Sequence, residues 1–273
     1  MSETPADHET GLLDLLDLEQ IEEDLFRANF LVQEEFALYG GQVAAQALLA
    51  AGSTVDRERQ PHSLHGYFLR GGDPLRPTVF QVFRDRDGGS YSARRVIAIQ
   101  QGAVIFNMAC SFHRPEESPS WQVEQLPATA PPDGLEPGRF HRLFSVEHRM
   151  PEQPYDRGWP TRFWARVSVP LPDDPLIHAC ALTYLSDVST GVLPAEDGSA
   201  GPGSSIDHAV WFHRPVDMTD WTLTEYHPRI ATGGRGWYTG SVFTADGTLV
   251  ASLTQEALFR GGRPAWDRRP TTG

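Results

Sequence analysis

One segment near the C-terminus carries a polar side chain on a face that is otherwise apolar. The segment reads LVASLTQEALFR and spans residues 249–260. Successive side chains of a β-strand point to opposite faces, so Gln255 shares a face with Leu253 and Ala257. A buried amide that lacks a hydrogen-bond partner costs about 1–3 kcal/mol. We therefore expect Gln255 to have polar partners inside the fold.

Two further polar residues in the same half of the chain could be its partners. Asp187 ends the run LIHACALTYLSD, where a carboxylate is unfavourable unless it has partners. Ser205 lies at the start of the segment SSIDHAVWFHRP. An acid, a hydroxyl and an amide that point inward from three elements can satisfy one another and hold one water molecule. Such a set is suited to a reaction in which water is the nucleophile.

The elements that must position these residues occur twice along the chain. Residues 39–56 and 171–187 are apolar nearly all round and predict buried helices, the second capped by Asp173 or Asp174 with Pro175 in its first turn. Each is followed by four strand-like segments: 63–70, 78–86, 90–100 and 103–114, then 204–215, 221–231, 234–244 and 249–260. A repeat at a period of about 145 residues indicates two copies of one fold.

This pattern predicts an α+β class, in which a helix packs against a strongly bent antiparallel sheet in each copy. We expect the N-terminal repeat to span residues 1–115 and the C-terminal repeat to span residues 161–273. Residues 116–160 are rich in Pro and Glu without a period and predict a connecting segment. Residues 12–27 predict a short amphipathic helix that runs into a strand.

The composition excludes several classes of function. The 273-residue chain has a formal net charge of −13, which disfavours nucleic acid and anionic membranes as partners. It contains no lysine, so Schiff-base and pyridoxal-phosphate chemistry are excluded. Cys110 and Cys180 lie in apolar runs without a CxxC motif, which predicts buried thiols in the cytoplasm. No apolar stretch approaches the roughly 18 residues of a membrane span.

Several sequence blocks resemble the type II acyl-CoA thioesterases, which have a double-hotdog architecture. The blocks are YGGQVAAQAL, HSLHGYFLRGGD, DGGSYSARRV, SDVSTGVLP, IDHAVWFHRP and DGTLVASLTQE, and they follow one another in the family's order over nearly the whole chain. The resemblance implies two repeats, each with a long central helix wrapped by a bent antiparallel sheet. It also implies hydrolysis of medium- to long-chain acyl-CoA to fatty acid and CoA, with no metal or organic cofactor, by a homodimer or homotetramer.

The resemblance further implies three catalytic residues, which fall on Asp187, Ser205 and Gln255. Asp187 would be the general base or the anion that orients the water, and Ser205 and Gln255 would hydrogen-bond the water and Asp187. A backbone N–H near a helix start would stabilise the oxyanion. Subtracting the repeat offset places Gln42 opposite Asp187 and Met108 or Cys110 opposite Gln255. We therefore expect one working site per chain, in the second half.

Three residues are candidates for substrate binding, each with a structural alternative. His62 lies in a family block and could bind substrate or act as a base. Arg94 could meet the CoA phosphates, because arginine suits phosphate, or could be a surface strand residue. Gly234 in GGRG could border the ligand or serve a turn. We expect the other strand histidines to serve packing and hydrogen bonding: His65, His208 and His213.

Two other functions remain open at this point. A hotdog enoyl-CoA hydratase or dehydratase would use an acid and a histidine on the helix, for which Asp173 and His178 have suitable spacing. A non-catalytic acyl-CoA-binding module would bind the thioester without turnover. The chain lacks the GxSxG motif of an α/β-hydrolase thioesterase and the HExxH motif of a zinc protease.

Overall fold

A computed structural model describes residues 11–30, 37–138, 140, 143–155, 160–188 and 203–259. Most of the block SDVSTGVLP lies outside the described residues. The first half contains α1 (Leu12–Leu15), β1 (Leu18–Glu22), β2 (Leu25–Ala28), α2 (Gly40–Gly52), β3 (Gln60–Phe68), β4 (Thr78–Asp87), β5 (Tyr91–Gln100) and β6 (Ala103–His113). The second contains a 3₁₀ turn (Pro132–Gly134), β7 (Pro137–Gly138), β8 (Val146–Arg149), β9 (Arg162–Val167), α3 (Pro175–Ser186), β10 (Asp207–Phe212), β11 (Thr222–Thr232), β12 (Arg235–Thr244) and β13 (Leu249–Leu258).

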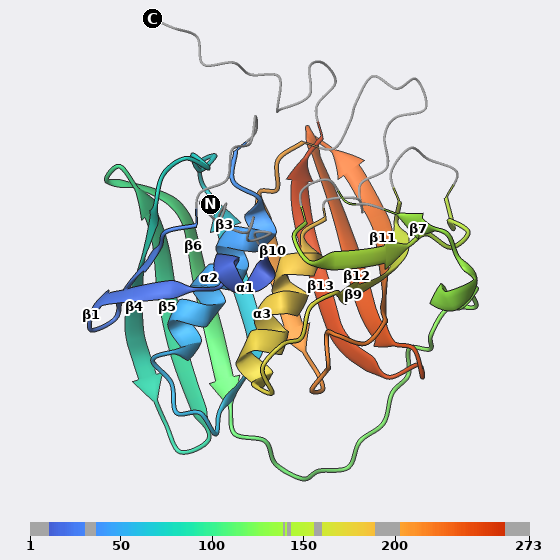
Figure 1. Ribbon diagram of the computed structural model, residues 1–273, viewed down its shortest axis with the longest axis horizontal. Helices are drawn as coiled ribbons and strands as arrows, with labels where there is room; N and C mark the ends of the chain where they lie inside the picture. The colour runs from blue at the N-terminus through green and yellow to red at the C-terminus, as the bar shows by residue number, and fades with distance from the viewer. Residues whose placement is uncertain are drawn as a thin grey trace, which may run out of the picture.

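The described strands form one antiparallel sheet of 13 strands that crosses both halves (Figure 1). Its order is β1-β2-β4-β5-β6-β3-β10-β13-β12-β11-β9-β8-β7. The halves meet where β3 pairs with β10, with Ala209 opposite His65. A continuous hydrogen-bond ladder therefore holds the two repeats together.

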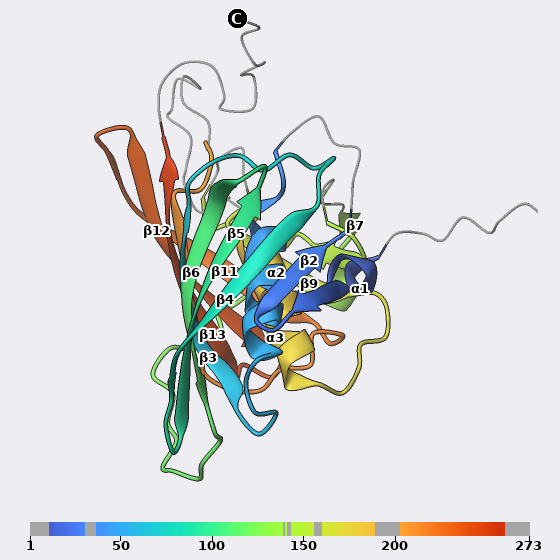
Figure 2. The same cartoon turned by 90° about the vertical axis from the view of Figure 1, so that its left-hand side faces the viewer.

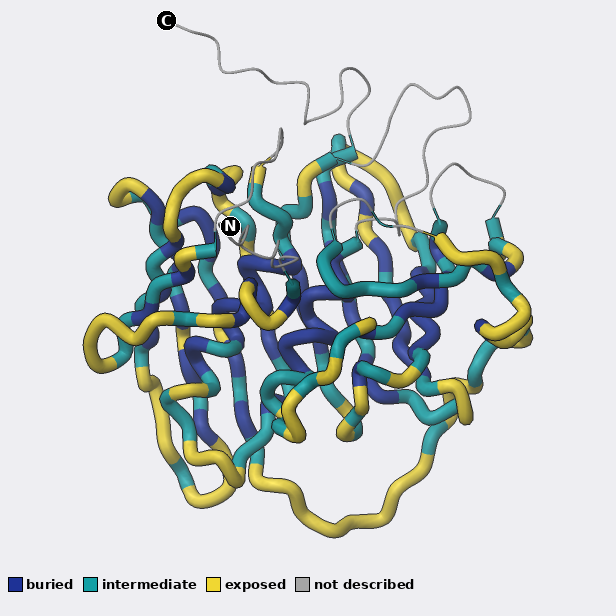
Figure 3. The backbone as a smooth tube through the Cα atoms, in the orientation of Figure 1, coloured by how far each residue is buried: buried dark blue, intermediate teal, exposed yellow. Residues whose placement is uncertain are grey.

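Both main helices lie on the same side of this sheet and contact each other (Figure 2). Their burial follows from composition, since Ala, Leu, Cys and Tyr line α2 and α3 nearly all round. Burial is concentrated where the helices meet the sheet, whereas the hairpin ends and the connection after β6 are exposed (Figure 3). The inner layer between helices and sheet contains the larger of the two described hydrophobic clusters and can shelter polar groups.

Both helices lie within the predicted ranges, 39–56 and 171–187, but they are shorter than those ranges. The Asp174 carboxylate accepts a hydrogen bond from the Leu176 N–H and Pro175 is the first helical residue, so Asp174 rather than Asp173 is the cap. The helices have 13 and 12 residues, which is about the average for globular proteins. The expected long central helix in each repeat is therefore not confirmed.

The eight expected strands are present, and the sheet contains five more. β1 and β2 extend one edge, where the sequence predicted a helix that runs into a single strand. β7, β8 and β9 extend the other edge, and β7 and β8 fall within residues 116–160. These strands have only two to six residues, so alternation along them gives little signal. No helix in the described part of the chain is both long and apolar enough to span a membrane.

Candidate active site

Asp187, Ser205 and Gln255 meet in a single hydrogen-bonded cluster. The Ser205 hydroxyl donates to Asp187 Oδ1 at 2.9 Å, and Gln255 Nε2 donates to the same oxygen at 2.6 Å. Gln255 Nε2 also donates to Ser205 Oγ. The amide on the apolar face thus has the partners that the alternation of β13 required.

Each residue of this cluster is placed by a different element. Asp187 is the C-cap residue of α3. Ser205 lies beside the end of β13, where it forms an isolated bridge with Ala257. Gln255 lies within β13 and is completely buried. A helix end, a bridge residue and a strand residue therefore converge beneath the sheet.

The first half completes the cluster through the start of α2. The Gly41 N–H hydrogen-bonds Asp187, so the carboxylate faces the positive end of the α2 dipole. A Cβ on Gly40 would lie 2.3 Å from Asp187 Oδ2, which means that only glycine permits this approach. The Gln42 N–H bonds the Tyr39 carbonyl oxygen, so only the earliest N–H groups of α2 face away from the helix. The site is therefore shared by the two halves.

Burial controls the protonation of Asp187. Its side chain is only 3% exposed, and burial raises the pKa of the carboxyl above its usual range. Hydrogen bonds from Gln255, Ser205 and Gly41 act in the opposite direction and favour the carboxylate. A carboxylate with a raised pKa is a stronger base than an exposed aspartate, which is what proton removal from water needs.

His208 joins the cluster from β10 through hydrogen bonds, as expected for the strand histidines, but its link to Gln255 was not predicted. Its Nδ1 lies 2.8 Å from Gln255 Oε1, and its Nε2 lies 2.7 Å from Ser186 Oγ. Its position two residues before Val210, itself fully buried, places it on the inner face of β10. That alternation was the available signal, but the contact with Gln255 depends on the pairing of β10 with β13.

Two buried tyrosines lie beside the cluster. The Tyr226 hydroxyl donates to the Ser186 carbonyl oxygen at 2.9 Å. Tyr238 pairs with Gln255 across β12 and β13, and its hydroxyl has no hydrogen-bond partner among the described residues. Burial raises the pKa of both phenols, so they stay protonated. Over the same ranges, no three His, Cys, Asp or Glu side chains are grouped to hold a metal ion.

Comparisons with known proteins agree with this architecture. Residues 33–113 match the family model for the acyl-CoA thioesterase N-terminal domain, and residues 115–259 match the one for the C-terminal domain. The chain belongs to the acyl-CoA thioesterase family. It is 32% identical to acyl-coenzyme A thioesterase 8 of Homo sapiens, over 90% of this chain and 88% of that protein. It is 33% identical to acyl-CoA thioesterase 2 of Haemophilus influenzae, over 92% and 97%.

Solved structures show the same fold for this acyl-CoA thioesterase. The crystal structure of an acyl-CoA thioesterase II, TesB2, from Mycobacterium marinum is 41% identical and covers 91% of this chain and 98% of that one, with a TM-score of 0.79. A hotdog-fold protein from Alicyclobacillus acidocaldarius, at 21% identity and a TM-score of 0.76, supports the fold alone. The chain is therefore a hotdog-fold enzyme of the thioesterase family.

His62 lies far from Asp187 in this thioesterase. Phe68, at the other end of β3, is the residue of that strand that approaches Gly40. His62 and Phe68 are six positions apart along β3, which corresponds to about 20 Å of strand. His62 Nε2 lies 2.8 Å from Ser111 Oγ, and its ring packs against Tyr91. These contacts support the packing alternative for His62.

Arg94 is buried rather than exposed to a phosphate. Its Nε donates to Thr54 Oγ1 at 2.8 Å and one terminal nitrogen donates to the Thr54 carbonyl oxygen at 3.0 Å. The remaining N–H groups bond Asp87 and the Arg86 and Ala93 carbonyl oxygens. The guanidinium joins the end of α2 to the β4–β5 hairpin, so we do not include Arg94 in the proposed substrate site.

Gly234 lies in the turn between β11 and β12 of the thioesterase. This turn is at the same end of the sheet as Ser205. Gly233 and Gly234 have φ values of 58° and 76°, which a type I′ turn requires of both central residues. The Gly234 carbonyl oxygen accepts from the Phe259 N–H, just beyond β13. The turn explains both glycines, and its location leaves Gly234 a candidate border of the substrate entrance.

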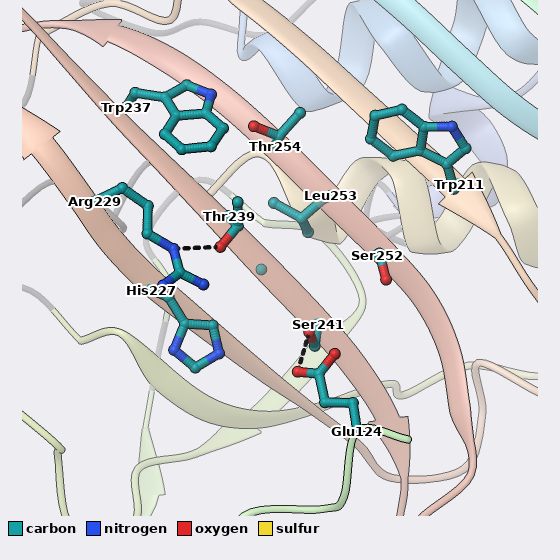
Figure 4. Close-up of a pocket in the computed structure, with 11 residues that line it drawn as sticks. Glu124, Trp211, His227, Arg229, Trp237, Thr239, Ser241, Ser252, Leu253 and Thr254 are labelled. Carbon is teal, nitrogen blue, oxygen red and sulfur yellow. Dashed lines mark hydrogen bonds between the residues drawn. The ribbon is translucent and has the colours of Figure 1, made fainter. Parts of the chain in front are cut away.

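A groove on the outer face of the sheet is separate from the cluster (Figure 4). It has a volume of about 440 Å³ and lies between Trp211, Trp237 and Glu124. Thr254 lines it, whereas its neighbour Gln255 points to the opposite face. The sheet therefore lies between this groove and Asp187.

The residues of the hydratase alternative are not assembled near the cluster. His178 lies at the start of α3, about 14 Å along the helix from Asp187. Its Nδ1 accepts a hydrogen bond from the Met218 N–H at 3.1 Å. Asp173 precedes the cap and the helix. The spacing that favoured this alternative thus reflects a helix start that is tied to a neighbouring loop.

The first half has a different counterpart for Asp187 than the sequence comparison gave. Gln42 lies in the first turn of α2, whereas Ser53 occupies the C-cap as Asp187 does in α3. The prediction of Gln42 was wrong, because the connection after α3 is longer than the one after α2. The register of the paired strands shows that Cys110, rather than Met108, is the first-half counterpart of Gln255. Neither Ser53 nor Cys110 repeats the acid or the amide.

Proposed function

We propose that this enzyme hydrolyses acyl-CoA thioesters to free acid and CoA, with Asp187, Ser205 and Gln255 as its catalytic residues. The observation that carries the proposal is the closed set of hydrogen bonds among these three side chains beneath the sheet. The names of the related proteins support the substrate class, since each is called an acyl-CoA thioesterase.

In the proposed mechanism, a water molecule attacks the thioester carbonyl. Asp187 takes the water proton, and Ser205 and Gln255 hold the water and the carboxylate in place. A positioned base of this kind contributes about 10²–10⁴-fold to the rate. A backbone N–H at the start of α2 donates to the oxyanion. The tetrahedral intermediate then expels the CoA thiolate, and Asp187 returns the proton.

We propose a medium- to long-chain acyl group as the substrate. The layer beside the cluster is apolar, as the close contact of the Phe68 and Phe106 rings at 4.8 Å illustrates. Apolar walls favour acyl chains in proportion to the area they bury. Two further proposals are a homodimer or homotetramer, supported by the exposed edge strand β1, and a cytoplasmic location, supported by the free buried thiols Cys110 and Cys180.

Thiol release from a panel of saturated acyl-CoAs tests the proposal. Wild type should release CoA, and Asp187→Asn and Gln255→Ala should lose most of the rate. Thr254→Val is the matched control, because Thr254 adjoins Gln255 but lines the outer face. Hydration of an enoyl-CoA without thiol release would favour the hydratase, and tight binding without turnover would favour a binding module.

A further inference from the structure

The amide of Gln255 can adopt two orientations that exchange its oxygen and nitrogen, and only one of them serves the cluster. With Nε2 toward Asp187 and Ser205, both N–H groups have acceptors. In the reversed orientation, the amide oxygen would face the Asp187 carboxylate, and two acceptors would repel each other. Because Gln255 is completely buried, its amide oxygen also needs a hydrogen-bond donor within the fold.

His208 contacts that oxygen end. Its Nδ1 lies 2.8 Å from Gln255 Oε1, and the imidazole is only 1% exposed. Burial lowers the pKa of His208, so the ring is neutral and carries a single N–H. Because Gln255 Oε1 is an acceptor, that proton belongs on Nδ1.

The other ring nitrogen of His208, Nε2, contacts the last residue of α3. His208 Nε2, without a proton, accepts from the Ser186 hydroxyl at 2.7 Å. That hydroxyl also lies 2.9 Å from the Thr183 carbonyl oxygen, so its single proton has two acceptors within reach. Ser186 immediately precedes Asp187 in α3. A closed path thus runs from α3 through β10 and β13 back to the carboxylate.

We infer that His208 is a positioning residue that holds the Gln255 amide with both N–H groups toward Asp187 and Ser205. The inference rests on the proposed function, because it assigns a role within that site. His208 makes no described hydrogen bond to Asp187, although a charge on its ring would favour the Asp187 carboxylate; its hydrogen bond to the site is the one to Gln255.

The first half provides an independent observation. At the junction, Ala209 pairs with His65, Thr254 pairs with Ala209, and Ala109 pairs with His65. His208 and Leu64 each precede these paired residues by one position, so they occupy equivalent places in the two repeats. Gln255 and Cys110 each follow Thr254 and Ala109 by one position and are equivalent in the same way. The histidine and the amide are both present in one half and both missing from the other, which indicates that they work as a pair.

Three substitutions at one position test the inference by steady-state thiol release. The amide nitrogen of H208N can occupy the place of Nδ1, whereas the longer H208Q places its amide near Nε2, and H208L removes both. We expect kcat to fall about tenfold or more in H208Q and H208L, the effect of one lost buried hydrogen bond, with little change in KM. The kcat of H208N should be close to that of wild type, because its amide keeps the hydrogen bond to Gln255. His213→Gln is the control, since His213 bonds Ser252 on the outer face.

A double-mutant cycle separates positioning from a general packing effect. In the Gln255→Ala background, H208L should cause little further loss of kcat, because the amide that it positions is gone. Circular dichroism and thermal unfolding identify variants that fail to fold, for which H208N and H208Q remain the matched pair.

Four results would overturn the inference. Wild-type kcat in H208Q would show that Gln255 needs no such partner. Equal losses in H208N and H208Q, or full additivity with Gln255→Ala, would indicate packing alone. If wild type releases no thiol from any acyl-CoA, the proposed function fails and the inference falls with it, whereas active wild type with active H208Q rejects only the role of His208.

Discussion

Substituting Gly40 by alanine should inactivate the enzyme although Gly40 lies in the half without the three proposed catalytic residues. The new Cβ would lie 2.3 Å from Asp187 Oδ2 and 2.9 Å from two carbons of the Phe68 ring. Ordinary contacts begin at 3.4 Å, so the carboxylate must move by about 1 Å. A displacement of about 1 Å at a reacting group costs about 10²-fold in rate. Crowding at a buried site should also lower the free energy of unfolding by about 1–3 kcal/mol.

Gly52→Ala supplies the control for this experiment. Gly52 ends the same helix, and a Cβ there would meet the partly exposed Leu176 side chain, with both terminal methyl groups at 2.5 Å and Cγ at 3.1 Å. Those methyls can rotate away, and alanine favours a helix over glycine by up to about 1 kcal/mol. We expect kcat of Gly52→Ala to stay close to that of wild type.

The assay is thiol release at saturating acyl-CoA, together with urea unfolding of each variant. The expected pattern is a large fall in kcat for Gly40→Ala and none for Gly52→Ala. If Gly40→Ala is folded and turns over like wild type, the approach of α2 to Asp187 does not govern catalysis, and the shared site is refuted.

Three further predictions concern protonation and stability. Because burial raises the pKa of Asp187, kcat/KM should fall with decreasing pH from a higher pH than an exposed aspartate would give, and a pH–rate profile with an acid limb in the ordinary aspartate range would contradict this. Tyr238→Phe removes a buried hydroxyl without a described partner and should raise the free energy of unfolding by about 1 kcal/mol in urea titration; a fall in kcat instead would assign the hydroxyl to substrate binding. Arg94→Met should lower the free energy of unfolding by about 2 kcal/mol and leave KM for acyl-CoA unchanged, whereas a raised KM in a stable variant would restore Arg94 to the substrate site.

The sequence was most informative where a periodic pattern and a polar residue coincided. Alternation placed Gln255 on the inner face of β13, and the apolar run ending at Asp187 placed the acid at the end of α3. Both statements concern a single element and its own period. The family resemblance then joined them to Ser205, for which local sequence alone gives almost no signal.

The contacts between elements could not be predicted in the same way. Gly40 and Asp187 belong to different halves, and their approach depends on how α2 and α3 pack. His208 meets Gln255 only because β10 pairs with β13 in one particular register. Arg94 had the sequence context of a surface strand residue, yet its inward face in β5 and the end of α2 bury it completely. Such contacts depend on tertiary packing, which periodicity does not encode.

The contact between Gly52 and Leu176 has a consequence for the division of labour between the repeats. It lies where the end of α2 meets the start of α3, as the contact between Gly40 and Asp187 lies where the end of α3 meets the start of α2. One of these two crossings contains a carboxylate against bare backbone, and the other is filled by a leucine. The two helix contacts are related by the approximate two-fold symmetry of the repeats but differ in chemistry. One is therefore suited to catalysis, and the other stabilises the packing of the two helices.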